Sequence, residues 1–432
     1  MLLNFSVENF GPIKERQTLS MEADKSDHLE EHYVMTTETG HRVLKLALIY
    51  GANASGKTTI LKAIDQLRKL VNSDQTYRDN TLDYNPFLFA RLNKTKPTRF
   101  AVDFIHEEVR YSYIISYNED AIIEESLFYF SPNRSKVFYR KLDPNKQTSI
   151  IQVGSKIKLH NTTKKLLEGN TLRNDTVFGG YRKTNVEILQ IQKALDWFKG
   201  FLNQVVYPEN NLADQTHRHL GNPNSDKDQF ISLLKKADFN ISDLIIEESN
   251  QGLSFVEKAQ NELYEKLGSV KRIKSFRVLL TRRFDDQLIS IPFSYESEGT
   301  KRYYGLLGIL QSLVQTNESL FIDELESSLH PELFQHFLLS FLVNAKQSQI
   351  IATTHYREVL NNRDLFRDDA IWFTDKPDGY ATELYSLADF DTSVVRDTTN
   401  VLNAYKAGKL GGVPNLGDYY INIPDGQAEE EA

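Results

Sequence analysis

A glycine-rich stretch near the N-terminus constrains this chain more than any other feature. It fits the pattern G-x-x-x-x-G-K-S/T, and its residues are Gly51, Ala52, Asn53, Ala54, Ser55, Gly56, Lys57 and Thr58. The preceding run Val43–Tyr50 is almost wholly apolar, as expected of a parallel strand buried on both faces. Apolar side chains then recur at helical spacing from Thr59 to Val71. A strand, a glycine-rich turn and a helix in this order predict a phosphate-binding loop, or P-loop.

Each part of the P-loop has a chemical task. The glycines let successive backbone N–H groups face a β-phosphate. Lys57 neutralises charge on the β- and γ-phosphates, and Thr58 supplies a hydroxyl to Mg²⁺. We therefore predict that residues 51–59, which include Thr59, bind a nucleotide together with Mg²⁺.

A second apolar strand, Ser319–Ile322, ends in two carboxylates. Asp323 lies at its C-terminal end, where it can hold Mg²⁺ through water, and Glu324 can orient or deprotonate an attacking water. The alternative is an acidic strand end that caps the helix beginning at Pro331. We prefer the catalytic interpretation because a P-loop requires such a partner.

A single histidine follows the next predicted strand. The run Gln349–Thr353 leads to Thr354 and His355, and an imidazole at this place can donate to a γ-phosphate. A lone histidine is normally a structural residue. Its order after the Asp323 strand favours a functional one, so we predict His355 and Glu324 as catalytic residues.

Composition excludes several other kinds of chemistry. The chain has 432 residues, 40% of them hydrophobic and 25% charged, as in ordinary globular proteins. This length is enough for two domains or one large interrupted domain. It contains no cysteine, which excludes disulfides, cysteine-ligated zinc and thiol nucleophiles. No apolar run reaches the length of about 18 residues that a membrane span needs, and the N-terminus does not resemble a signal peptide. We expect a cytoplasmic protein without a membrane partner.

The net charge of −8 argues against non-specific coating of nucleic acid, which needs broad cationic surfaces. One local basic stretch stands out, made of Lys271, Arg272, Lys274, Arg277, Arg282 and Arg283. A solvated strand face is the simpler interpretation. A surface for nucleic acid or for a protein partner is the alternative.

The hydrophobic pattern predicts an α/β chain in four parts. The expected strands are Leu2–Phe10, Val43–Tyr50, Arg99–Ile105, Val109–Tyr117, Lys136–Arg140, Phe276–Leu280, Leu288–Phe293, Leu320–Asp323, Gln349–Thr353 and Ala370–Thr374. The expected helices are Thr59–Val71, Glu187–Val205, Gln229–Lys236, Phe255–Leu267, Thr300–Gln315 and Pro331–Asn344. The four parts are an N-terminal lobe over 1–158, a helical insertion over 159–268, a C-terminal lobe over 269–425 and an acidic, disordered tail over 426–432.

These motifs, in this order, resemble the ABC ATPase superfamily. In that superfamily a second motif, with serine and glycine, opens a helix and completes the nucleotide site of the partner subunit. Ser297 and Gly299 stand at the corresponding place, and the D-loop would fall at Ser327–His330. The motif is shorter than the usual LSGGQ form and resembles the SMC, RecF and OLD-like branch. The resemblance implies an ABC-type P-loop NTPase head, ATP and Mg²⁺ as cofactors, and hydrolysis within a homodimer or higher homo-oligomer.

Further stretches narrow the resemblance. They are Val7–Phe10, Glu296–Arg302, Asp323–Pro331 and Tyr405–Pro414. Together they look like the AAA-type ATP-binding proteins of restriction-linked and abortive-infection loci. That family implies bacterial antiphage defence, in which the ATPase is a switch or scaffold that controls a separately encoded effector protein. The chain contains no second catalytic constellation, so a destructive activity is expected in the partner.

Three alternatives remain. A DNA repair or maintenance ATPase of the RecF or SMC type would share every catalytic motif, although the missing heptad repeat disfavours an SMC architecture. A module that only binds nucleotide is disfavoured by the intact catalytic residues, and a transporter subunit by the long insertion between Thr58 and Ser297.

One departure from the superfamily is the lack of a convincing Q-loop glutamine, since Gln66 lies on the predicted P-loop helix.

Overall fold

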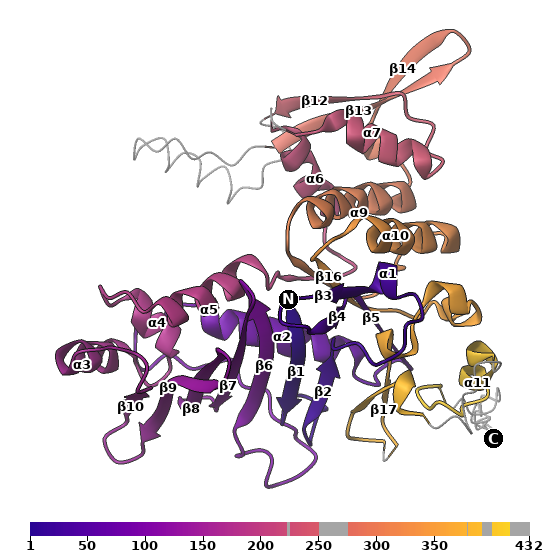
Figure 1. Cartoon of the computed structure of the whole chain (residues 1–432). Helices are drawn as coiled ribbons and strands as arrows, with labels where there is room; N and C mark the ends of the chain where they lie inside the picture. The colour runs from indigo at the N-terminus through magenta and orange to yellow at the C-terminus, as the bar shows by residue number, and fades with distance from the viewer. Residues whose placement is uncertain (223–224, 250–274, 378, 391–399, 415–432) are drawn as a thin grey trace, which may run out of the picture.

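The computed structural model describes residues 1–222, 225–249, 275–377, 379–390 and 400–414. They form two large sheets, and helix α2 (Lys57–Asn72) contacts β1 (Leu2–Glu8) of one and β5 (Leu46–Gly51) of the other (Figure 1). A three-stranded sheet projects beyond α9 (Glu298–Gln315) and α10 (Pro331–Asn344), at the top of the view. The predicted α/β class is confirmed.

The six-stranded sheet carries the nucleotide motifs. Its order is β11-β15-β16-β5-β17-β18, with parallel neighbours from β11 to β17 and an antiparallel β18 at the edge. Its further members are β11 (Val205–Val206), β15 (Ser319–Ile322), β16 (Gln349–Thr353), β17 (Ile371–Asp375) and β18 (Glu383–Ser386). Every residue of β5, β15 and β16 is buried, which explains why these strands are apolar runs rather than alternating patterns. The carboxyl ends of the parallel strands meet at one edge, where the site lies.

The second large sheet is antiparallel throughout, in the order β10-β9-β8-β7-β6-β1-β2. Its further members are β2 (Gln17–Ser20), β6 (Thr98–His106), β7 (Val109–Tyr117), β8 (Ile122–Phe130), β9 (Arg134–Asp143) and β10 (Thr148–Val153). Helix α5 (Leu189–Gly200) packs on it, with the ring of Trp197 stacked 4.0 Å from that of Phe104. This aromatic contact joins the sheet to the helices that flank α2.

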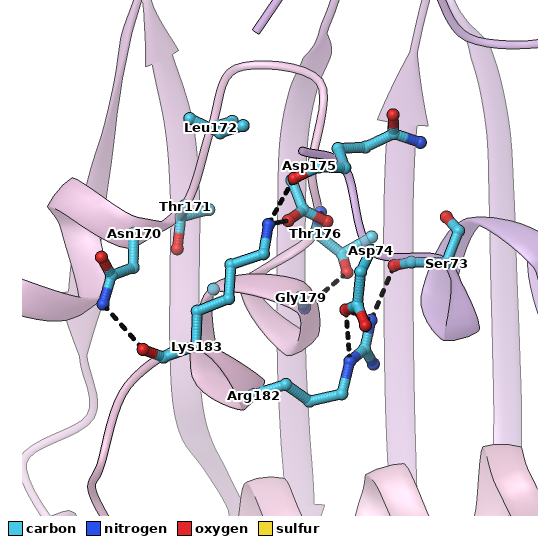
Figure 2. Close-up of polar contacts among 12 residues, drawn as sticks. Ser73, Asp74, Asn170, Thr171, Leu172, Asp175, Thr176, Gly179, Arg182 and Lys183 are labelled. Carbon is cyan, nitrogen blue, oxygen red and sulfur yellow. Dashed lines mark hydrogen bonds and ion pairs between the residues drawn. The ribbon is translucent and has the colours of Figure 1, made fainter. Parts of the chain in front are cut away.

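The C-terminal end of α2 is held by Arg182, the last residue of the neighbouring helix α4 (Val177–Arg182). Figure 2 shows Arg182 donating to Asp74 Oδ1 at 2.7 Å and to the Ser73 carbonyl at 2.6 Å, with Lys183 paired to Asp175 at 2.6 Å. A cation that donates to carbonyls at a helix C-terminus also compensates the helix dipole. The P-loop helix is therefore fixed at the end opposite the nucleotide motif.

The remaining elements cover the two sheets or form the upper part of the molecule. They are α1 (Glu30–Tyr33), β3 (Val34–Thr36), β4 (Arg42–Leu44), α3 (Asn161–Asn170), α6 (Leu212–Leu220), α7 (Lys227–Lys236), β12 (Asp243–Ser249), β13 (Ser275–Phe284), β14 (Gln287–Pro292), η1 (Phe293–Tyr295), η2 (Arg357–Asn361), η3 (Arg363–Leu365), η4 (Asp368–Ala370), η5 (Leu387–Asp389) and α11 (Val401–Lys406). Within the described residues, no helix is long and apolar enough to cross a membrane.

Two predicted elements are corrected by the structure. The strand predicted at Val43–Tyr50 is two strands in two sheets, because the chain changes direction at Lys45, whose ammonium donates to the Leu342 carbonyl. The helix predicted at Glu187–Val205 ends at Gly200, and Val205 belongs to β11, which pairs with β15 in the six-stranded sheet. Most other predicted elements differ only at their ends, as is usual for sequence patterns. The predicted helix Phe255–Leu267 and the tail 426–432 lie outside the described residues.

The division of the chain into lobes remains a prediction. The sheet topology shows which strands of these predicted parts pair with one another. Strand β5, before the P-loop, lies between β16 and β17 of the predicted C-terminal lobe. From the predicted insertion, β11 joins the same sheet and β12 pairs with β13. Strands from different predicted parts of the chain therefore lie side by side in shared sheets.

Helices α6 and α9 pack closely through two glycines. A Cβ on Gly305 would lie 2.4 Å from the Leu212 side chain, and one on Gly308 would lie 2.1 Å from Thr216 Oγ1. His217 follows on α6, is only 7% exposed, and has its ring 4.9 Å from that of Phe293. Burial lowers the pKa of His217 to about 4.

His217 should make the fold sensitive to acid. Because the pKa of His217 is lower in the folded state than the ordinary value near 6.5, the folded protein binds fewer protons than the unfolded chain between these values. This contribution is complete above about pH 6.5 and is lost as the pH falls towards the folded pKa, by about 2 kcal/mol between pH 7 and pH 5. Urea unfolding at the two pH values should show a smaller loss for His217→Phe than for the wild type. The exposed neighbour His219, changed to Gln, is the control, and an equal loss in wild type and His217→Phe would contradict the assignment.

Candidate nucleotide site

The P-loop backbone requires glycine at two positions. The φ angle is +154° at Gly51 and +114° at Gly56. A Cβ on Gly51 would lie 2.5 Å from Ser55 Oγ and from Thr374 Oγ1, and one on Gly56 would lie 2.4 Å from Thr382 Oγ1. The loop is thus closely surrounded by side chains, and only glycine leaves room at these two points.

The hydroxyls of two threonines outside the motif, Thr374 and Thr382, contact the loop. Ser55 Oγ lies 2.6 Å from Thr374 Oγ1, and Thr382 Oγ1 donates to the Ser55 carbonyl at 2.7 Å. Thr374 and Thr382 belong to the region of β17 and β18, more than 300 residues along the chain. Sequence reasoning missed both, because a threonine in or beside a strand is common and carries no functional mark.

Lys57 is a nearly buried cation at the mouth of the loop. Lys57 is only 6% exposed. Its Nζ donates to the carbonyl of Gly51 at 3.0 Å and to that of Ala52 at 3.1 Å. Burial lowers the pKa of Lys57, and the carboxylates of Asp323 and Glu324 oppose that shift. The ammonium is therefore held by neutral carbonyls, which a phosphate group can replace as stronger acceptors.

Asp323 follows β15 and lies beside Thr58 in the first turn of the P-loop helix. Thr58 Oγ1 donates to its carboxylate at 2.9 and 3.1 Å, and Thr353 Oγ1 donates at 2.5 Å. The structure thus brings together the two residues predicted to hold Mg²⁺. One hydroxyl and one carboxylate suit this ion, which commonly takes its other ligands from water and substrate phosphates.

Glu324 occupies a constrained turn immediately after β15. Its φ angle is +47°, in the left-handed region that residues with a side chain rarely adopt. Its N–H donates to Thr353 Oγ1 at 2.9 Å, and its carbonyl accepts from Ser327 at 2.8 Å. Thr353, which sequence reasoning treated only as a strand residue, therefore fixes both Asp323 and Glu324.

His355 follows β16 and is exposed. Its backbone N–H donates to Glu326 Oε1 at 2.5 Å. Partial desolvation and the charge of Lys57 lower the pKa of His355, while Glu326, Glu324 and Asp323 oppose the shift. The imidazole is therefore neutral at neutral pH and has one N–H to donate.

The second motif and the predicted D-loop meet at the start of α9. Ser297 is the N-cap residue, and its Oγ accepts from the Thr300 N–H at 3.1 Å. A Cβ on Gly299 would lie 2.8 Å from the carbonyl of Ser328, which itself has a φ angle of +62°. Ser297 and Ser328 are both exposed, so the two loops form one surface.

The late family-like stretch Tyr405–Pro414 packs against the P-loop. A Cβ on Gly412 would lie 3.4 Å from the Cα of Gly51, and Tyr405 donates to the Gly412 carbonyl at 3.0 Å. The ring of Tyr405 also stacks on Phe373 of β17, with 5.4 Å between centroids. Sequence reasoning used this stretch only as a family marker and had no signal for its place.

The basic stretch and the missing Q-loop glutamine are the two other features noted in the sequence. Of the basic stretch, Lys271, Arg272 and Lys274 lie outside the described residues, and Arg282 is paired with Glu296 at 2.6 and 2.9 Å. Gln66 is buried on α2 and donates to the Asp83 carbonyl at 3.0 Å. Neither observation identifies a nucleic-acid surface or a Q-loop.

Strand β5, the P-loop, α2 and the carboxylates after β15 define a P-loop NTPase of mixed α/β fold. The chain belongs to the family described as "AAA domain, putative AbiEii toxin, Type IV TA system", whose profile matches residues 46–155 and 228–361. It is therefore a member of a P-loop ATPase family.

Comparison with solved structures shows a likeness to SMC heads. A structure titled "Crystal structure of the SmcHead bound to the C-winged helix domain of ScpA" has 12% identity and a TM-score of 0.38, covering 89% of this chain and 97% of that chain. The SMC head domain from Thermotoga maritima has 13% identity and a TM-score of 0.37, covering 89% of this chain and 98% of that chain. The fold description rests on this chain's own strand order, since both scores are low. No curated protein matches the sequence.

Proposed function

We propose that this chain is an ABC-class ATPase that hydrolyses ATP to ADP and phosphate with Mg²⁺. The observation that carries the proposal is the meeting of Thr58, Asp323 and Thr353 in one hydrogen-bonded group beside the buried ammonium of Lys57. These residues come from three elements, α2, β15 and β16, and converge at the carboxyl edge of the parallel strands. Ligands of open parallel sheets bind at that edge.

Each residue takes a role that its contacts support. Lys57 binds the β- and γ-phosphates in exchange for its carbonyl contacts. Backbone N–H groups of the loop bind the β-phosphate. Thr58 and Asp323 would hold Mg²⁺, which when bound supplies charge neutralisation at the phosphates. Glu324, fixed by Thr353, orients the attacking water and accepts its proton, and neutral His355 donates to the γ-phosphate.

The exposed surface formed by Ser297, Gly299 and Ser328 suits a contact between two copies of the chain. The polar contacts of Ser297 stay within the first turn of α9, which leaves its outer face open. We propose that this surface completes the nucleotide site of a partner copy, in a homodimer or higher homo-oligomer. ATP then acts as the link between copies.

At the level of the cell, the proposed role is that of an ATPase switch or scaffold in a cytoplasmic antiphage system, controlling a separate effector protein. The support is the family description, which names a putative toxin of a type IV toxin–antitoxin system, together with the motif resemblance at both ends of the chain. A DNA repair or maintenance ATPase is the competing role, since it would use the same site.

Phage plating on cells that carry the complete locus tests the cellular role. We expect the wild-type locus to reduce plating, and Lys57→Ala to restore plating to the level of cells without the locus. Lys62→Ala is the matched control, because Lys62 is an exposed lysine on the same helix. A pull-down of the tagged protein from the same cells should recover an effector encoded beside it. Unchanged plating, with the protein found only at replication forks or repair foci, would favour DNA maintenance instead.

A further inference from the structure

A large cavity lies beside the first turns of α9 and reaches Ser328 of the exposed surface described above. Its volume is about 1040 Å³, and its walls come from the loop before α6, from α6 itself, and from β13, η1 and the first turns of α9. No P-loop residue lines it. The volume is at the upper end of the range found for small-molecule sites, which is roughly 300–1,000 Å³.

Arg302 of α9 faces this cavity with two unused donors. The residue is only 8% exposed, and its Nη1 makes a long contact of 3.5 Å with the Pro208 carbonyl. Across the described parts of the chain, no hydrogen-bond acceptor reaches its Nε or its Nη2. A buried guanidinium without acceptors is costly, so native structures normally supply a partner for one.

The two unused donors share one edge of the guanidinium plane. Nε and Nη2 point in nearly the same direction, and this fork matches the two oxygens of a carboxylate or phosphate. His217 lines the same cavity, and its Nε2 is also buried without an acceptor or donor among the described residues. Two independent unpartnered groups thus face one space. Such a pairing is typical of a site that a polar ligand completes.

Other charges around the cavity define what competes with a ligand. Lys301 and Arg277 line it, and Lys301 is paired with Glu298 at 2.9 Å. Glu209 and Asp214 also line it, and the charge of Glu209 acts on Arg302. Glu209 is exposed, and its charge acts on Arg302, so among the described residues it is the carboxylate best placed to approach the fork in the absence of a ligand.

We propose that this cavity binds a small molecule through an oxyanion group, carboxylate or phosphate, held by Nε and Nη2 of Arg302. The cavity wall also includes Glu298 and Ser328, which belong to the two loops that form the exposed surface described above. A molecule bound in the cavity would therefore lie next to the surface proposed to meet a partner copy, and its binding could affect that contact. The proposal does not depend on ATP hydrolysis and can hold if the proposed function fails.

Thermal melting with inorganic phosphate, and separately with acetate, tests the site. All variants are made in a Lys57→Ala background without Mg²⁺, to remove the strongest feature of the other anion site, and chloride keeps the ionic strength constant. A ligand that binds the folded state raises the melting temperature with its concentration, which gives an apparent Kd. We expect Arg302→Met to weaken binding of at least one probe by about tenfold or more, because it removes charged hydrogen bonds. Arg302→Lys keeps the charge without the fork and should show a smaller loss.

The control is Arg283→Gln, an exposed arginine of β13 that does not line the cavity, and it should bind the probe like the background. The probe that binds distinguishes a phosphate ester from a carboxylate as the natural group. Binding that is equal in Arg302→Met and the background would overturn the proposal, as would no response to either probe. If Arg302→Met does not fold, the comparison of Arg302→Lys with Arg283→Gln decides. A large loss of melting temperature in both Glu209→Gln and Arg302→Met, without any probe, would show an internal ion pair and would also overturn it.

Discussion

Glu324→Gln is expected to bind ATP and Mg²⁺ normally but to hydrolyse ATP about 10²-fold more slowly, or slower still. The amide has the size of the carboxylate but cannot accept the proton of the attacking water. The backbone contacts of the turn, from Glu324 N–H to Thr353 and from Ser327 to the Glu324 carbonyl, do not involve the side chain and should persist. Steady-state phosphate release and a nucleotide-binding titration measure the two properties separately.

A second result should accompany the slow turnover. If ATP links two copies, dimers with bound ATP accumulate in Glu324→Gln, and light scattering during gel filtration will detect them. Glu332→Gln is the control, because Glu332 is an exposed carboxylate in the first turn of α10. A variant that turns over ATP at the wild-type rate would assign water activation to another residue, and His355 is the next one to change.

The nucleotide motif could be predicted because its parts are adjacent in sequence. Strand, loop and helix follow one another from Leu46 to Asn72, and the positive φ angles at Gly51 and Gly56 are a local backbone reason for glycine there. Asp323 could be placed for a related reason, since a carboxylate at the end of a buried parallel strand faces the same edge as the P-loop. In the structure, Thr58 and Asp323 are indeed hydrogen-bonded.

Residues that support the site could not be predicted, because their role depends on pairing between distant strands. Thr353 orients Asp323 and Glu324 only since β16 lies between β15 and β5. Thr382 and Gly412 reach the P-loop from the C-terminal region. A threonine or a glycine in such places is too common in sequences to indicate these contacts.

Short or interrupted elements were also beyond the sequence pattern. Val205–Val206 is a strand of two residues, and pairing with β15 rather than its own propensity defines it. The apolar run through Lys45 indicates one strand, because a single lysine hardly changes the hydrophobic pattern. Tertiary structure nevertheless divides the run between two sheets. Both errors arise from long-range pairing that overrides local preference.

Mixing two inactive variants is expected to restore part of the ATPase activity, if each site is built from two copies. Lys57→Ala removes the phosphate-binding ammonium, and Ser297→Arg places a large cation on the surface proposed to meet the partner's nucleotide. Loss of the N-cap hydroxyl costs only about 1 kcal/mol, so the second variant should fold. Each homodimer carries its lesion at both sites. In a heterodimer both lesions fall on one composite site, and the other site has wild-type Lys57 and Ser297.

The expected size of the recovery follows from random pairing. In an equal mixture half of the dimers are mixed and each has one intact site, so the rate should reach about a quarter of that of the wild type. The rate is measured across mixing ratios after subunit exchange has been verified with differently tagged chains. Mixing Lys57→Ala with wild type gives the control for dilution alone. A mixture no more active than the sum of its parents would mean that hydrolysis occurs within one chain, or that both sites must be intact for either to act.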